Sequence, residues 1–297
     1  MAKITAADVK KLREATGAGM MDCKKALGEV DGHHDAAVDF LRKKGLAAAS
    51  KKAGRVAAEG VVATTTQGNA SVVLEVNAET DFVSKNEQFV GFVEAVNALI
   101  LNQRPADIEA LKALPFDAEL NVEQALSQLI STIGENMSIR RFEVLETEGV
   151  TASYIHGAGR IGVLVAIKGE SSTALQDVAR GVAMHVAAVN PTFVSRASVT
   201  KEAIERERKV LTDRALATGK PEAIVDKIVS GQMNKFYSEN CLLDQEFVMD
   251  TDTTVGKAIK AVDAKAELVA MVRFGLGEGI EKEESDFAAE VAAQIKG

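Results

Sequence analysis

The fold is first indicated by Ser71-Val-Val-Leu-Glu-Val-Asn77, a hydrophobic and largely β-branched run that is typical of a strand. A strand is also predicted over residues 59–66, and the turn Gln67-Gly-Asn-Ala70 joins the two into a hairpin. A second strand, turn and strand follow over residues 148–168. The repeated hairpin predicts a body built from two similar halves.

Each predicted hairpin is followed by a helix and later by a third strand. The helices are predicted over residues 86–102 and 173–189, and the third strands over 141–145 and 267–274. This order, found twice, predicts an α+β body with two antiparallel three-stranded sheets, each with helices on one face. A parallel Rossmann sheet is not expected, because strand and helix do not alternate strictly.

The N-terminal part predicts three short helices that pack into a small bundle. A capping box at Thr5 begins the first helix, and Gly17 ends it. We expect Asp22 to cap the second helix and Gly45 to follow the last turn of the third. The alanine-rich, basic residues 46–55 are predicted to form a helical linker.

A helical hairpin interrupts the second half. A helix is predicted over residues 200–218, and Gly219-Lys-Pro221 supplies a stop and a restart. Ile224, Ile228 and Val229 continue a narrow apolar seam on the second helix. The pattern predicts a projecting coiled-coil arm.

These patterns divide the chain into four parts. They are a three-helix domain with its linker (1–55), a first core subdomain (56–146), a second core subdomain with the arm inserted at about 200–240 (147–282), and a C-terminal helical segment (283–297).

Charge is distributed unevenly along the chain. The 297 residues carry a net charge of −8, yet residues 1–55 hold 12 Lys and Arg against 7 Asp and Glu. The acidic remainder argues against broad nucleic-acid binding, which depends on neutralising phosphates. Aromatic residues make up 4% of the chain and Trp is absent, so base-stacking surfaces are not expected either. The basic N-terminal part leaves two interpretations open, an RNA- or ribosome-binding surface and ordinary solvated helix faces.

Nothing in the sequence predicts a membrane segment or an exported protein. The first residues contain no apolar core of a signal peptide, and no apolar run approaches the roughly 18 residues of a membrane span. Cys23 and Cys241 lie far apart, and neither belongs to a Cys-x-x-Cys motif. We therefore expect a cytoplasmic protein that does not bind membranes.

Motifs of catalysis are absent or explained by the fold. Gly157-Ala-Gly-Arg-Ile-Gly162 resembles a dinucleotide fingerprint, but a strand rather than a helix follows it, so it is predicted to be a hairpin turn. No phosphate-binding P-loop occurs, and none of the four histidines has a second ligand at metal spacing. His185 lies in an apolar helix, where a partly buried histidine is the ordinary interpretation. We expect no enzymatic chemistry, no metal and no cofactor.

The most informative loop is Thr80-Asp81-Phe82-Val83. A capping box at Ser84 predicts that the following helix begins near residue 85, which leaves these four residues between a strand and that helix. An acid beside an aromatic ring at such a place can act as a wedge in a partner's pocket. The alternative is that Phe82 packs onto Phe89 or Phe92 of its own chain.

Five segments of the chain resemble the bacterial translation elongation factor Ts family. The first is Leu12-Arg-Glu-Ala-Thr-Gly-Ala-Gly-Met-Met-Asp-Cys-Lys-Lys-Ala-Leu27, and the second is residues 75–85 around Thr-Asp-Phe-Val. The others are residues 184–188, 235–248 and 273–281. The similarity runs from the first helix to about residue 282. Ala78 and Gly275 depart from the residues more usual in the family, but neither touches the Asp-Phe pair.

The resemblance implies a guanine nucleotide exchange factor that binds GDP-loaded elongation factor Tu, drives out GDP and is released when GTP binds. It implies that Phe82 is a wedge, that Asp81 disturbs the partner's magnesium site, and that Thr80 and Val83 complete this element. It also implies that the N-terminal domain is similar to a ubiquitin-associated three-helix bundle.

The resemblance further implies where the partner docks. The N-terminal domain would contact the partner's nucleotide-binding domain through Arg13, Met20, Met21 and Lys24, and the second half, including His185, would contact another domain. A dimer through the arm is left open. The competing hypotheses are an RNA-binding module, a nucleotide-dependent oxidoreductase and an adaptor that binds the GTPase without changing GDP release.

Overall fold

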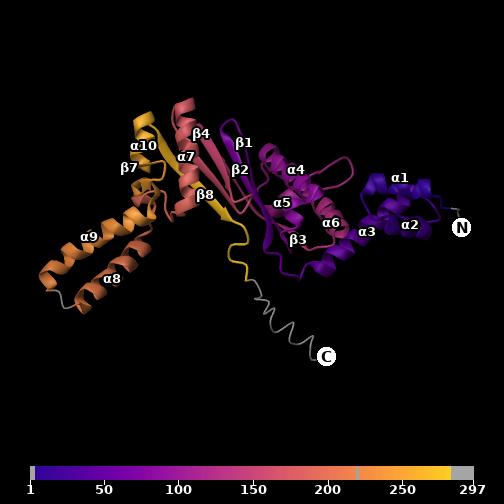
Figure 1. The fold of residues 1–297 in the computed structure, drawn as a ribbon, viewed down its shortest axis with the longest axis horizontal. Coiled ribbons are helices and arrows are strands. Elements are labelled where there is room, and N and C mark those ends of the chain that lie inside the picture. Colours follow the sequence, from indigo (N-terminus) through magenta and orange to yellow (C-terminus); the bar gives the residue numbers. More distant parts are fainter. Residues whose placement is uncertain (1–3, 219–220, 282–297) are drawn as a thin grey trace.

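The computed structural model describes residues 4–218 and 221–281 (Figure 1). The helical segment predicted at 283–297 lies outside these residues. Three helices form one end of the molecule, two sheets with their helices form the middle, and a helical hairpin projects at the other end (Figure 1). In the described part of the chain, no helix is long and apolar enough to cross a membrane.

The N-terminal bundle contains α1 (Ala6–Thr16), α2 (Met20–Glu29) and the first part of α3 (His34–Lys52). The capping box predicted at Thr5 is confirmed, and Gly17 ends α1 in the left-handed conformation at φ 66°. Leu12, Cys23 and Leu27 are fully buried among the helices. The predicted start of α2 is wrong, because Gly19 is the N-cap and Asp22 lies in the first turn.

The third helix does not end at Gly45, as the sequence suggested. It continues through the predicted linker to Lys52 and packs on α6 (Val122–Ile133). A Cβ atom at Gly45 would lie 3.6 Å from the carbonyl oxygen of Ser127, an ordinary van der Waals distance, so Gly45 lies inside α3 at its contact with α6. One continuous helix therefore joins the bundle to the first half of the body.

The first half contains a three-stranded antiparallel sheet, as predicted, and its strand order is β1-β2-β3. Its strands are β1 (Glu59–Gln67), β2 (Ala70–Ala78) and β3 (Met137–Glu146). The helices α4 (Glu87–Gln103), α5 (Ile108–Ala113) and α6 accompany it. Leu74 of β2 and Phe89 and Ile100 of α4 are fully buried in the core that forms between sheet and helices.

The second half repeats this plan with the sheet order β4-β5-β8. Its strands are β4 (Gly149–His156), β5 (Ile161–Lys168) and β8 (Glu267–Gly275), and its helices are α7 (Thr173–Val189) and α10 (Val255–Val262). Gly157 and Gly159 lie in the β4–β5 turn at φ 62° and 89°, which confirms a turn rather than a dinucleotide motif. A small sheet of β6 (Glu246–Phe247) and β7 (Asp250–Thr254) was not predicted.

The two sheets pack face to face, a feature that the sequence analysis did not predict. Val62 and Val73 of the first sheet pack with Leu164 and Phe274 of the second. Every residue of β2 is buried, because one face of the strand meets the helices and the other meets the second sheet. The α+β class is thus confirmed, with the two sheets as inner layers and helices outside them (Figure 1).

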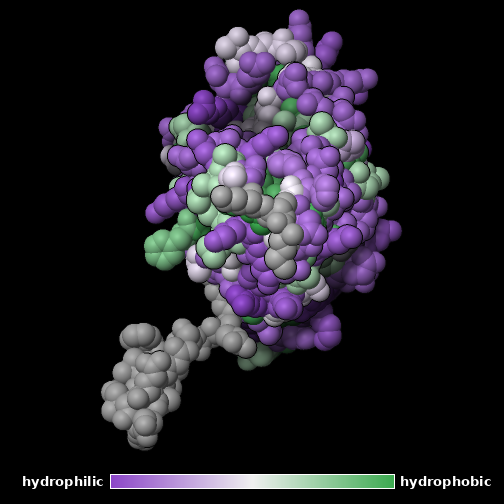
Figure 2. Space-filling view, turned by 90° about the vertical axis from the view of Figure 1, so that its right-hand side faces the viewer, coloured by the Kyte–Doolittle hydropathy of each residue, from purple (hydrophilic) through white to green (hydrophobic). Residues whose placement is uncertain are grey.

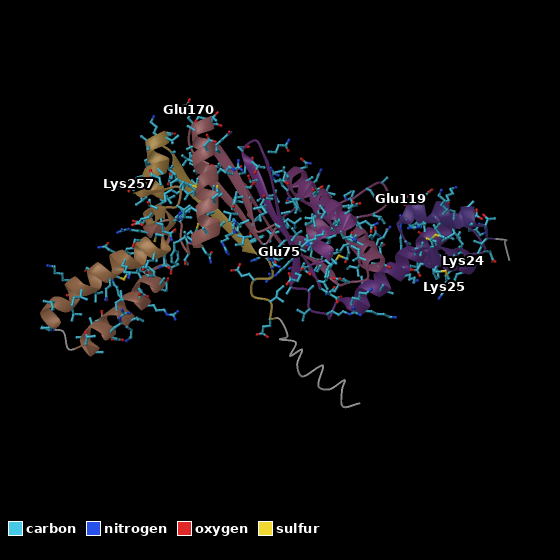
Figure 3. The ribbon with its side chains drawn as sticks, in the orientation of Figure 1. Lys24, Lys25, Glu75, Glu119, Glu170 and Lys257 are labelled. Carbon is cyan, nitrogen blue, oxygen red and sulfur yellow. The ribbon has the colours of Figure 1, made fainter. Side chains whose placement is uncertain are left out.

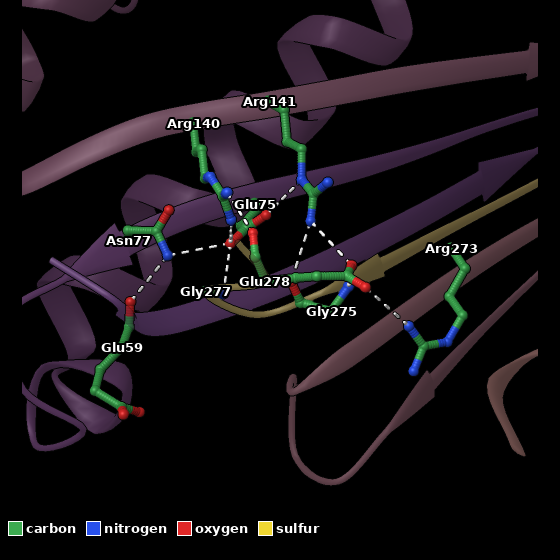
Figure 4. A network of polar contacts seen from close by, with 9 residues as sticks. All are labelled: Glu59, Glu75, Asn77, Arg140, Arg141, Arg273, Gly275, Gly277 and Glu278. Carbon is green, nitrogen blue, oxygen red and sulfur yellow. Dashed lines mark hydrogen bonds and ion pairs between the residues drawn. The ribbon is translucent and has the colours of Figure 1, made fainter. Parts of the chain in front are cut away.

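A buried carboxylate lies where the two halves meet. Glu75 of β2 accepts hydrogen bonds from Arg140 Nη1 at 2.9 Å, Arg141 Nε at 2.6 Å and the backbone N–H of Gly277 at 2.8 Å (Figure 4). Burial raises the pKa of Glu75, but these bonds outweigh it and hold the pKa below its ordinary value of 4.5. Because Gly277 follows β8, the ionised Glu75 ties the second half to the first. Figure 3 shows its place in the middle of the molecule.

The arm consists of α8 (Lys201–Ala217) and α9 (Glu222–Asn240). Leu211 and Ala215 pack against Val225, Val229 and Met233 to form its seam. Ile224 was predicted to belong to this seam but is 43% exposed, because Val225 takes the inward position. A dimer through the arm stays a prediction.

Candidate functional site

The loop singled out in the sequence joins β2 to α4. Phe82 is 80% exposed, whereas its neighbour Val83 is buried. Phe89 and Phe92 are buried in the core of the first half, so the alternative in which Phe82 packs onto them is wrong. We refer to Asp81 and Phe82 together as the tip.

The chain leaves the tip through a single 3₁₀ turn at Val83–Lys85 before α4 begins. The predicted capping box at Ser84 is wrong, because Asn86 caps α4 by accepting from the backbone N–H groups of Gln88 and Phe89. Ser84 instead donates its hydroxyl to the carbonyl oxygen of Asp81 at 2.6 Å. Ser84, which was expected to cap the helix, therefore holds the backbone of the tip through this hydrogen bond.

Two carboxylates hold the base of the tip. Glu135, just before β3, accepts the backbone N–H of Thr80 at 2.9 Å and the Thr80 hydroxyl at 2.7 Å. In return, Glu79 accepts the backbone N–H of Asn136. Glu135 and Asn136 were not predicted from the sequence, because they lie 55 or more residues from their partners along the chain and belong to no recognisable motif.

The residues expected to contact a partner from the N-terminal bundle lie on its surface. Met20 and Met21 are 52% and 75% exposed, and Arg13 and Lys24 are also exposed. Met20, Met21 and Lys24 share one face of α2, because residues three and four positions apart are neighbours on a helix. Figure 2 views the molecule from this end, where hydrophilic residues cover most of the surface and hydrophobic ones appear in small patches. Figure 3 marks Lys24 on the bundle.

His185 does not lie on the surface. Its side chain is fully buried, so it cannot make the direct contact that the resemblance implied. Its Nε2 lies 2.9 Å from Gln245 Oε1, and its Nδ1 accepts the backbone N–H of Val248 at 3.2 Å. These partners place the proton of a neutral imidazole on Nε2. Burial lowers the pKa of His185, although the bond to Gln245 opposes this in part.

His185 instead supports two exposed hydrophobic residues that the sequence analysis missed. Val248 and Met249, in the turn between β6 and β7, are 42% and 57% exposed. Gly181 of α7 permits this turn to approach, because a Cβ atom there would lie 2.9 Å from Phe247 Cζ. The signal was the apolar run Phe-Val-Met between Glu246 and Asp250, at the end of the segment that carried the resemblance.

The candidate residues do not converge on one pocket. The N-terminal bundle, the tip and the β6–β7 turn belong to three separate parts of an elongated molecule (Figure 1). Among the described residues, no group of three or more His, Cys, Asp or Glu side chains could hold a metal ion. The arrangement suits a macromolecular partner that touches several places at once.

Comparisons with known proteins show the family of the chain. A family model described as Elongation factor TS matches residues 79–278. The chain is 55% identical to Elongation factor Ts of Rhodospirillum rubrum, with both chains covered in full. It is 54% identical to that of Paramagnetospirillum magneticum, covering 99% of this chain and 98% of the relative. These similarities show that the chain belongs to the elongation factor Ts family, whose role lies in translation elongation.

Proposed function

We propose that this protein is a guanine nucleotide exchange factor for elongation factor Tu. In this proposal the tip enters the partner beside its magnesium ion and promotes release of GDP. The observation that carries the proposal is the 80% exposure of Phe82 on a loop whose base is held by Glu135 and Glu79. An aromatic side chain this exposed gains little from packing on its own chain, and aromatic residues often anchor protein interfaces.

The proposed mechanism follows from the charge of the magnesium ion. In a GTPase this ion bridges the phosphates of the nucleotide and is the largest local positive charge. In this proposal Asp81 brings a carboxylate near the ion, and the Phe82 ring displaces the partner's residues beside it. Both changes weaken the partner's affinity for GDP. By linkage, GDP must weaken the partner's hold on this protein by the same factor.

The tip needs an anchored interface to act. An acceleration of about 10⁴-fold requires roughly 5.5 kcal/mol of barrier lowering, more than one ring and one carboxylate are expected to supply. We propose that the exposed face of α2, with Met20, Met21, Lys24 and the nearby Arg13, binds the partner's nucleotide-binding domain. We propose further that Val248 and Met249 bind a second domain, with His185 as their support.

Stopped-flow release of a fluorescent GDP analogue from elongation factor Tu tests the proposal. We expect the wild-type protein to accelerate release, and we expect the acceleration to shrink when magnesium is removed with a chelator. An adaptor would bind the GTPase and leave the release rate unchanged. An acceleration that is equal with and without magnesium would contradict the magnesium mechanism while leaving exchange itself in place.

A further inference from the structure

We propose that Glu135 is a positioning residue that holds the tip in the direction required for exchange. This inference rests on the proposed function. Glu135 is half-buried in the turn between α6 and β3, and it binds both the backbone and the hydroxyl of Thr80. Thr80 directly precedes the tip, so the carboxylate fixes the chain at the last residue before Asp81.

The orientation of Phe82 depends on the contacts of its neighbouring residues. Its ring has little packing of its own, since 80% of the residue is exposed. Three contacts set its backbone instead: the carboxylate of Glu135 on Thr80, the Ser84 hydroxyl on the Asp81 carbonyl, and the buried side chain of Val83. A loop fixed before binding presents the ring in the direction that exchange requires, so its loss should reduce the rate rather than the affinity.

Glu135 belongs to a set of hydrogen bonds that join the turn before β3 to the loop after β2. A carboxylate that accepts an N–H and an O–H at 2.9 and 2.7 Å makes two charge-assisted hydrogen bonds. Glu79 and Asn136 add a reciprocal bond between the same two segments, and the Asn136 amide also donates to the carbonyl oxygen of Arg55 at 2.7 Å. The turn before β3 and the loop after β2 are therefore fastened at two adjacent positions.

The second half contains a weaker counterpart of this fastening. There the backbone N–H of Glu170, just after β5, donates to Asp263, which precedes β8, at 3.3 Å. This connection carries no aromatic residue, and no side-chain hydroxyl reinforces the bond to Asp263. In the second half, one backbone hydrogen bond to Asp263 joins the two segments. In the first half, where the tip follows, several hydrogen bonds join them.

The test compares GDP release from elongation factor Tu in the presence of Glu135→Ala, Glu135→Gln and the matched control Asp263→Asn. We expect Glu135→Ala to slow release at saturation about tenfold, the scale of loss when a group is slightly misplaced. Its affinity for the nucleotide-free partner should stay within about twofold of wild type. Glu135→Gln should recover most of the rate, because its amide oxygen can accept the Thr80 N–H and its NH₂ can donate to the hydroxyl. Asp263→Asn should leave the rate unchanged.

A double-mutant cycle separates positioning from a general loss of structure. If Glu135 acts through the ring, adding Glu135→Ala to Phe82→Ala should slow release by less than about twofold beyond Phe82→Ala alone. Full additivity would overturn the inference, as would wild-type rates for Glu135→Ala. Should Glu135→Ala fail to fold, Thr80→Val removes only the hydroxyl contact, and we then expect a loss of about threefold.

Amide hydrogen exchange of the free protein provides a readout that needs no partner. The amide of Thr80, which donates to the Glu135 carboxylate, should exchange faster in Glu135→Ala than in wild type or Asp263→Asn. Unchanged protection would overturn the inference. Failure of the wild-type protein to accelerate GDP release would instead overturn the proposed function, and the two outcomes are therefore distinguishable.

Discussion

In the first half of the molecule, residues 79–86 join the middle strand to the helix, whereas residues 169–172 make the same connection in the second half. The shorter connection is closed by Ser172, which caps α7. The longer one holds the exposed Phe82 and the fastening at Glu135. The two halves share a fold, and the additional residues of the first half carry the feature that we propose drives exchange.

The second half exposes its hydrophobic residues elsewhere. Val248 and Met249 lie in the β6–β7 turn, which belongs to the segment inserted between α7 and β8. Their support is the buried His185 of α7. We therefore hypothesise that the first half determines the rate of GDP release and that the second half contributes affinity.

The largest expected effect concerns the joint between the halves. Glu75→Gln removes the negative charge that Arg140, Arg141 and Gly277 surround, and we expect it to lower the free energy of unfolding at pH 7 by about 3 kcal/mol. Because the pKa of Glu75 is lowered in the folded protein, this stabilisation is complete above 4.5 and is lost as pH falls through the folded value. Urea unfolding at several pH values should show the two proteins converging below pH 4.5.

The control for this prediction is Glu148→Gln, which removes an exposed ion pair with Lys168. Surface pairs contribute little, so a change below about 0.5 kcal/mol is expected. Equal effects of the two substitutions would contradict the role given to Glu75.

The next largest effect is expected at Phe82, which the connection in the first half carries and the one in the second half lacks. Phe82→Ala should slow GDP release from elongation factor Tu by roughly ten- to a hundredfold, or about 1.4–2.8 kcal/mol, because it removes the wedge and leaves the fold intact. Stopped-flow fluorescence measures the rate. Val90→Ala, which truncates an exposed residue on the neighbouring α4, serves as control and should leave it unchanged. Wild-type rates for Phe82→Ala would show that the tip does not act.

A smaller effect is expected from the second half. Met249→Ala should weaken binding to nucleotide-free elongation factor Tu about fivefold, or roughly 1 kcal/mol, while the release rate at saturation stays constant. Titration calorimetry gives the affinity, and Val262→Ala on α10 supplies an exposed control. A slower GDP release at saturation would contradict the hypothesis that the second half contributes affinity and not rate.

The smallest effect follows from the pKa of His185. Burial lowers this pKa below 6.5, so the neutral ring is stable at pH 7, and protonation on acidification would remove the acceptor of the Val248 N–H. We expect partner affinity to fall about threefold, or roughly 0.7 kcal/mol, as the pH drops from 7 through the lowered pKa of His185. Met249→Ala should show a weaker dependence, because its contact is already reduced. Identical pH profiles for wild type and Met249→Ala would contradict this role of His185.

The sequence predicted both hairpins well, because turn residues and β-branched runs act locally. It did not predict that the sheets stack. In β2 the residues Val72 and Leu74 face the helices while Val73 and Glu75 face the second sheet. The nearly uninterrupted apolar run was the signal for burial on both faces, but the charge of Glu75 concealed it.

The candidate site was only partly predictable. The exposure of Phe82 could not be decided, since an aromatic residue beside a helix start can pack inward or point outward. Glu135 depends on a contact across 55 residues, and His185 entered from a resemblance that carries no information about burial. The helix end predicted at Gly45 was wrong because a glycine can also lie inside a helix, and the sequence around it does not distinguish the two.

The unbroken course of α3 has a mechanical consequence. At 1.5 Å per residue its 19 residues form a rod of about 28 Å, with the bundle at one end and α6 along the other. Helix α6 ends at Ile133, two residues before Glu135. We therefore expect a tilt that a bound protein imposes on the bundle to be passed along α3 and α6 toward the neighbourhood of Glu135.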